Sequence, residues 1–130
     1  MTRVLRITAN LAAGDPMDLQ PFYQYLFGLE VVMDLGFITT LEGAARQPVQ
    51  LSLASEGGGG TPVPHLSIEV ESLDPVIARA RLRSLPVEYG PVVEPWGVRR
   101  LMLRDPGGRL LNVLEHVTLP KAPPSRSEES

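Results

Sequence analysis

The same order of predicted elements occurs twice along this chain, and this repetition limits the folds that the chain can adopt. Each half shows an alternating strand pattern, then a helical pattern, then three short strand patterns, a repeat of about 50 residues. Residues 56–63 contain four consecutive glycines and predict a flexible linker between the halves. We therefore expect one domain made of two βαβββ modules, residues 1–55 and 64–117, followed by a disordered tail at 118–130.

The first half opens with a predicted strand and helix. The segment Val4–Leu11 alternates apolar and polar residues, as in a half-buried strand. Apolar side chains at helical spacing follow and are assigned to the core: Leu19, Phe22, Tyr23 and Leu26. If Asp18 is the N-cap of this helix, Pro21 falls in the first turn, where proline is tolerated, and Gly28 is expected to end the helix. Three short strands are then expected near Glu30–Leu35, Phe37–Glu42 and Val49–Ala54.

The second half repeats this order. His65–Val70 alternates again and predicts a strand. Ser72 or Asp74 is expected to cap a helix that has Pro75 at its start, a position that suits proline, and that runs to about Leu85. Three further strands are expected at Val87–Val93, Val98–Arg104 and Leu110–His116.

Composition excludes several classes of function. The 130 residues include no cysteine, so disulfides, thiolate metal sites and cysteine nucleophiles are ruled out. A formal net charge of -3 argues against a nucleic-acid surface, which normally needs a basic patch. No apolar run approaches the roughly 20 residues that span a membrane, and the first residues do not have the pattern of a signal peptide. We expect a cytoplasmic protein with no nucleic-acid or membrane partner.

Four short motifs carry a resemblance to a known family. They are Phe22-Tyr23, Gly28-Leu29-Glu30, Trp96-Gly97-Val98-Arg99-Arg100 and Asp105-Pro106-Gly107-Gly108. Their order and spacing, over about Val4–His116, resemble the glyoxalase/bleomycin resistance/dioxygenase family, also called the vicinal oxygen chelate superfamily. The resemblance implies an α+β fold in which the two βαβββ modules form a curved eight-stranded sheet around a ligand cavity. It also implies a homodimer, because two chains commonly pair in this family.

Metal-dependent members of the family hold one divalent ion through side chains on four strands. The positions of this sequence that match those ligands are Thr8, Gln50 or Ser52, His65 and Asn112. Only His65 is a good ligand, and the neutral amide of Asn112 stands where the family usually has a glutamate. Catalytic ion sites need three or more histidine, carboxylate or thiolate ligands, so we expect no metal cofactor. If a metal does bind, His65 is the expected ligand.

Other polar and aromatic residues leave alternatives open. His65 is either a general base or a cavity-lining histidine without a catalytic role. Trp96 either stacks on a flat ligand or closes the end of the barrel as packing. Arg100, on the same strand face as Arg104, either binds an anionic ligand or is a solvated residue or a partner of Asp105. Asp105 itself is assigned to a structural turn.

The preferred hypothesis is a metal-free member of this family that binds a small organic molecule, as the bleomycin-resistance type sequesters a drug. The candidate ligand-binding residues are His65, Asn112, Thr8, Gln50, Trp96 and Arg100. No catalytic residue is assigned. The alternative is a metal-dependent lyase, isomerase or dioxygenase, which requires a shift in strand register that brings in Glu69, Glu115 or His116. A third possibility is an accessory domain whose cavity is filled by side chains.

Overall fold

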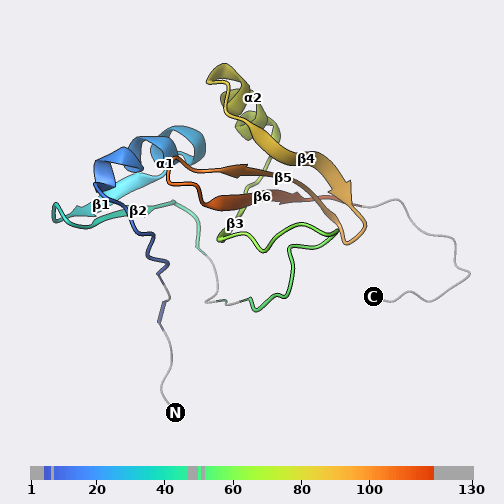
Figure 1. Cartoon of the computed structure of the whole chain (residues 1–130), viewed down its shortest axis with the longest axis horizontal. Helices are drawn as coiled ribbons and strands as arrows, with labels where there is room; N and C mark the ends of the chain where they lie inside the picture. Colours follow the sequence, from blue (N-terminus) through green and yellow to red (C-terminus); the bar gives the residue numbers. More distant parts are fainter. Residues whose placement is uncertain (1–4, 7, 47–49, 51, 119–130) are drawn as a thin grey trace, which may run out of the picture.

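A computed structural model describes residues 5–6, 8–46, 50 and 52–118 (Figure 1). Within these ranges the elements, in chain order, are η1 (Pro16–Asp18), α1 (Gln20–Phe27), β1 (Glu30–Asp34), β2 (Thr39–Glu42), β3 (Leu66–Glu69), α2 (Asp74–Leu82), β4 (Val87–Glu94), β5 (Val98–Arg104) and β6 (Leu110–His116). Strands β1 and β2 form an antiparallel hairpin. The other four strands form a sheet in the order β3-β6-β5-β4, in which only β3 and β6 are parallel. None of the helices in the described ranges has the length and apolar content needed to cross a membrane.

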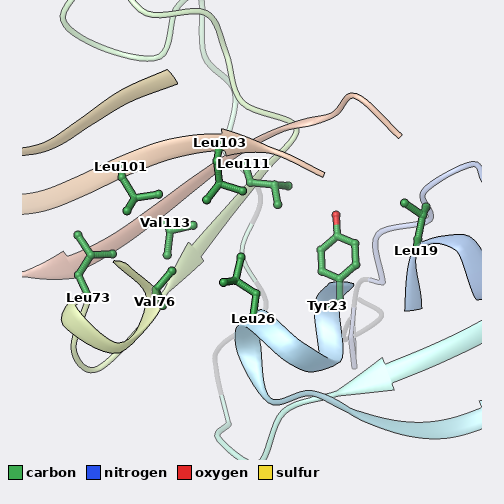
Figure 2. Packing of buried hydrophobic residues seen from close by; sticks show 9 residues of the cluster. All are labelled: Leu19, Tyr23, Leu26, Leu73, Val76, Leu101, Leu103, Leu111 and Val113. Carbon is green, nitrogen blue, oxygen red and sulfur yellow. The ribbon is translucent and has the colours of Figure 1, made fainter. Parts of the chain in front are cut away.

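The hydrophobic core lies between the two α-helices and one face of the four-stranded sheet (Figure 2). Leu101 and Leu103 of β5 and Leu111 and Val113 of β6 are fully buried there. Side chains of both helical regions complete the cluster: Leu19, Tyr23, Leu26, Leu73 and Val76. Because successive residues of a strand point to opposite faces, the residues between these core positions lie on the face away from the helices.

Helix α1 confirms the predicted core stripe but begins differently. Tyr23 and Leu26 are buried, and the helix ends at Gly28, whose φ of 66° is the left-handed conformation expected of a C-terminal glycine. Asp18 does not cap this helix, whose N-cap position is Leu19. Asp15 instead accepts a hydrogen bond from the backbone N–H of Met17 and starts the short turn η1, which runs directly into α1. Asp18 is therefore inside a helical turn.

The second half follows the sequence prediction closely. Strands β5 and β6 have the predicted bounds, and β4 extends one residue further, to Glu94. Helix α2 is shorter than predicted, because Ser84 adopts a left-handed φ of 53° and ends the helical path before Leu85. Neither Ser72 nor Asp74 caps this helix through its side chain, and Leu73 holds the N-cap position.

The predicted curved eight-stranded sheet is not confirmed, because the described residues contain six strands in a two-stranded and a four-stranded sheet. Residues 5, 6 and 8–11 of the expected first strand have no strand partner, nor do residues 50 and 52–54 of the expected fourth strand. Strand geometry is maintained by ladder hydrogen bonds, and no strand pairs with the described residues of these two segments. Residues 4, 7, 49 and 51 of these two segments, and residues 119–130 of the expected tail, lie outside the described residues.

Candidate functional site

One cavity of the structure, the larger of the two described below, has a volume of about 550 Å³. It lies between residues 8–13, helix α1 and residues 37–41 of the β1–β2 hairpin. This volume falls within the range of about 300–1,000 Å³ that is usual for small-molecule sites. Leu11, Leu19, Phe37 and Leu41 give the cavity a largely apolar wall.

Polar atoms in the wall of this cavity belong to uncharged side chains. Thr8, Thr39 and Thr40 line it, together with the amide of Gln20. That amide donates a 3.1 Å hydrogen bond to Gln24, while its own oxygen is buried and has no hydrogen-bond partner among the described residues. None of the residues that the structure describes in this wall carries a formal charge. The cavity is therefore suited to a neutral, mainly apolar molecule.

Tyr23 connects this cavity to the turn before β6. Its hydroxyl donates a 2.7 Å hydrogen bond to Oδ2 of Asp105. Burial first, and then this bond to the carboxylate, raise the pKa of Tyr23 well above its usual value, so the phenol stays neutral. Oδ1 of Asp105 accepts hydrogen bonds of 2.9 Å from the backbone N–H groups of Gly107 and Arg109, as expected of a turn residue. Arg109 also donates to the carbonyl oxygen of Ala12 in the cavity wall.

Arg100 is buried on the sheet face away from the helices. Its Nε donates to Oε2 of Glu94 at 2.8 Å, and its two η nitrogens donate to the carbonyl oxygens of Gly57 at 2.8 Å and Gly58 at 3.1 Å. The alternatives of a solvated Arg100 or a partner of Asp105 are therefore wrong. The β4–β5 hairpin brings Glu94 onto the Arg100 side chain, whereas the cation beside Asp105 is Arg109 of its own turn.

Two aromatic rings flank the Arg100 guanidinium. The rings of Tyr89 and Trp96 each lie 5.2 Å from it, which is within cation–π range. The hydroxyl of Tyr89 donates a 2.7 Å bond to Glu94, and this bond raises the pKa of Tyr89. Burial alone would raise the pKa of Glu94, but hydrogen bonds from Tyr89 and Arg100 outweigh it and lower that pKa. Trp96 thus packs over a buried ion pair and remains half exposed.

The glycine-rich segment is a defined turn in the structure. Residues 56–61, here called the glycine loop, are joined internally by backbone hydrogen bonds from Gly57 to Thr61 and from Thr61 to Gly58. The N–H of Gly60 also donates to the Glu56 carboxylate at 2.9 Å. A second hollow of about 300 Å³ lies between this loop and the sheet residues Met102 and Leu110.

The structure does not bring together the residues that match the family's metal positions. Thr8 lines the cavity beside α1, whereas Asn112 lies on the opposite sheet face and donates to Ser67 at 3.1 Å. His65 is exposed and accepts a 3.3 Å hydrogen bond from the backbone of Leu110, and Gln50 is exposed outside any strand. The described part of the chain contains no group of three or more His, Cys, Asp or Glu side chains that could hold a metal ion. This donor set does not fit a catalytic divalent ion.

The residues that a register shift would bring in have other partners. Glu115 accepts hydrogen bonds from the backbone of Leu73 at 2.7 Å and from Arg99 at 3.2 Å, at the start of α2. The first of these bonds caps that helix. Glu69 and His116 form an exposed pair at 2.9 Å, which supplies only two ligands.

Several residues around the larger cavity and around Arg100 were not singled out from the sequence. In the larger cavity they are Gln20, Thr39 and Thr40, and beside Arg100 they are Tyr89 and Glu94. The threonines carry no motif, and their place depends on how the hairpin lies against α1. A signal for Glu94 was present, because it ends one strand of a short hairpin whose other strand carries Arg100.

Solved structures resemble this chain in fold. One is TnmS3, an antibiotic binding protein from Streptomyces sp. CB03234, with a TM-score of 0.62, 19% identity and coverage of 89% of this chain and 97% of that one. Another is lactoylglutathione lyase from Agrobacterium tumefaciens, with a TM-score of 0.61, 22% identity and coverage of 88% and 94%. A third is a glyoxalase/bleomycin resistance protein/dioxygenase superfamily member from Sphaerobacter thermophilus DSM 20745, with a TM-score of 0.58, 21% identity and coverage of 89% and 98%.

This chain has the fold of the glyoxalase/bleomycin resistance protein/dioxygenase superfamily. The resemblance predicted from the four sequence motifs is confirmed at the level of the fold. No family model and no curated protein sequence matches the chain. At these sequence identities the structural similarity establishes the fold but not the reaction, because one fold hosts many chemistries.

Proposed function

We propose that this protein binds a small, uncharged organic molecule in the 550 Å³ cavity and holds it without a metal cofactor and without transforming it. The observation that carries the proposal is the cavity itself, which combines a suitable volume with an apolar wall and neutral polar groups. The open volume also argues against an accessory domain whose cavity is filled by side chains.

The fold alone does not choose between binding and catalysis, since its neighbours include both an antibiotic binding protein and a lyase. The side chains favour binding. Asn112 presents an amide where a metal-dependent enzyme would need a carboxylate, and the Nδ1 atom of His65 already accepts a backbone hydrogen bond. The metal-dependent lyase, isomerase or dioxygenase that the fold would also permit lacks a matching donor set.

In the bound state the threonine hydroxyls of the cavity would orient the molecule. Thr8, Thr39 and Thr40 can each donate or accept a hydrogen bond, and Phe37 offers an aromatic wall. These groups give direction to a ligand whose affinity comes mainly from burial of apolar surface.

We further propose that two copies of the chain pair through the β1–β2 hairpin. Every residue of β1 is exposed, including Val31, Val32 and Met33, and Phe37 at the hairpin end is 81% exposed. A two-stranded hairpin that exposes apolar side chains on both faces is only marginally stable in water. A second copy of the hairpin would cover them and would also offer strand partners to residues 8–11.

A titration with a neutral fluorescent probe tests the binding function. We expect 1-aminoanthracene to bind saturably, and Thr40→Phe to weaken it about tenfold or more, because overpacking a filled site costs about 1–3 kcal/mol. Glu42→Phe is the matched control, since it adds the same ring on the same strand at a residue that does not line the cavity. Absence of saturable binding, or equal affinity in Thr40→Phe and wild type, would contradict the proposal.

A further inference from the structure

The α1 side of the 550 Å³ cavity carries two polar side chains one helical turn apart. Gln20 and Tyr23 are separated by three residues on α1, so they lie on the same face of the helix, and both line the cavity. The threonines of the wall come from other segments: Thr8 precedes the helix, and Thr39 and Thr40 belong to β2. The polar character of the α1 side therefore depends on Gln20 and Tyr23.

The hydroxyl of Tyr23 has already given away its only proton. It donates to Oδ2 of Asp105 at 2.7 Å. Asp105 is in turn surrounded by donors, because its Oδ1 accepts the backbone N–H groups of Gly107 and Arg109 at 2.9 Å and the Arg109 guanidinium lies 3.7 Å from Oδ2. Asp105 therefore acts as the acceptor toward Tyr23 as well. Any further hydrogen bond to the Tyr23 oxygen must come from a donor.

Gln20 repeats this arrangement with an amide. Its Nε2 donates a 3.1 Å hydrogen bond to Oε1 of Gln24. Its own Oε1 is buried and has no hydrogen-bond partner in the described part of the chain. A buried acceptor without a partner is rare in folded proteins and is energetically costly. A donor group supplied by a ligand would remove that cost.

We infer that the cavity selects neutral molecules that carry an N–H or O–H group, because Tyr23 and Gln20 each have a donor bound within the protein and an acceptor left for the ligand. This ligand class rests on the proposed function, since it concerns the same cavity. The described wall carries no formal charge, so the donor should be an uncharged group rather than an ammonium. Aromatic amines and phenols combine such a donor with a large apolar surface.

Molecules of the same shape without a donor should bind less well. An ether, ester or ketone offers only acceptors, and a methyl group offers neither donor nor acceptor. Each would leave the oxygens of Tyr23 and Gln20 without a partner inside the filled cavity. Sites that hydrogen-bond a ligand discriminate strongly against analogues that lack the matching group, because the buried polar atoms of the site then stay unpaired.

A matched pair of fluorescent probes tests this selectivity. 1-Aminoanthracene and 1-methylanthracene have the same ring system and nearly the same size, but only the amine donates hydrogen bonds. The quantity to measure is the donor ratio, which is the Kd of 1-methylanthracene divided by the Kd of 1-aminoanthracene. The two probes differ in their partition from water, but this difference enters the ratio equally for every variant. A change in the ratio therefore reports on the cavity wall.

Tyr23→Phe removes one acceptor and keeps the ring. We expect the donor ratio to fall about three- to tenfold, the effect of losing one hydrogen bond. Asp105 does not line the cavity, so it does not replace the lost acceptor. Tyr25→Phe is the matched control, because it makes the same change on α1 at a hydroxyl that bonds to the carbonyl oxygen of Arg79 and does not line the cavity. The control should keep the wild-type ratio.

Gln20→Met removes the second acceptor, and its donor ratio should fall in the same direction. Because Gln20 is only partly buried, this variant decides the question if Tyr23→Phe fails to fold and loses both probes. Wild-type ratios in Gln20→Met and in folded Tyr23→Phe would overturn the donor selectivity and leave the proposed function intact. An equal fall in Tyr23→Phe and Tyr25→Phe would overturn the role of Tyr23. Failure of both probes to bind wild type would instead overturn the proposed function itself.

Discussion

The hydroxyl of Tyr23 donates a 2.7 Å hydrogen bond to the carboxylate of Asp105, a residue 82 positions further along the chain. Tyr23 belongs to α1 and lines the larger cavity, while Asp105 organises the turn between β5 and β6. Because both groups are buried, this bond fixes the first half of the chain against the second beside the cavity.

Tyr23→Phe should therefore lower the free energy of unfolding by about 1.5–3 kcal/mol, the usual contribution of a hydrogen bond to a charged group. The measurement is chemical denaturation followed by circular dichroism. Tyr25→Phe is the matched control, because its hydroxyl makes an exposed 3.1 Å bond to the carbonyl oxygen of Arg79 and its ring still contacts Arg83. Equal losses in the two variants would show that the buried bond has no special role.

The raised pKa of Tyr23 also predicts how the stability of the protein changes at alkaline pH. Burial and the Asp105 hydrogen bond raise its folded-state pKa above the ordinary 10.0, so the folded chain holds this proton more tightly than the unfolded chain. The resulting stabilisation is complete below pH 10 and is lost as the pH rises above it. Denaturation at several alkaline pH values should show wild type losing stability faster than Tyr23→Phe. Parallel pH profiles would rule out this role for Tyr23.

The buried pair of Glu94 and Arg100 should be far more sensitive to mutation than an exposed pair of the same hairpin. Glu94→Gln leaves the Arg100 guanidinium without its anion and should cost about 3–5 kcal/mol of stability. Glu88→Gln, which breaks the exposed pair with Arg104, should cost less than about 1 kcal/mol. Thermal and chemical unfolding of the two variants gives the comparison, and similar small losses in both would contradict a buried ion pair.

The carboxyl group of Glu94 also makes the stability of the protein depend on pH in the acid range. The folded-state pKa of Glu94 lies below the ordinary 4.5, so its stabilisation is present above pH 4.5 and is lost as the pH falls through the folded value. The free energy of unfolding of Glu94→Gln should therefore not show this loss as the pH falls.

The sequence was most informative where structure depends on neighbouring residues. Strands β5 and β6 were predicted at their observed bounds, because alternation and the Asp105–Gly108 turn are local signals. The first strand was predicted from its alternation and the fourth as a short strand segment, but a strand also needs a partner, and the described residues of the chain provide none. The binding of Arg100 to Gly57 and Gly58 joins residues over 40 positions apart, and local patterns carry no information on such contacts.

Pairing of two chains through the β1–β2 hairpin predicts a specific mutational pattern. Light scattering should give twice the mass of one chain for wild type, and Val32→Glu should shift the protein toward the single-chain mass, because it places a charge in the covered apolar surface. Leu82→Glu is the control, since Leu82 is 80% exposed on α2, away from the hairpin. A single-chain mass for wild type, or an equal shift in both variants, would exclude this interface.

The most direct test of the central claim is a titration of chelator-stripped protein with 1-aminoanthracene, repeated after addition of nickel, zinc, manganese or, under anaerobic conditions, ferrous iron. We expect saturable binding to the stripped protein, with an affinity that no added metal changes, because the 550 Å³ cavity is built from uncharged side chains. Binding that is absent from the stripped protein and appears only with a metal would contradict metal-free ligand binding.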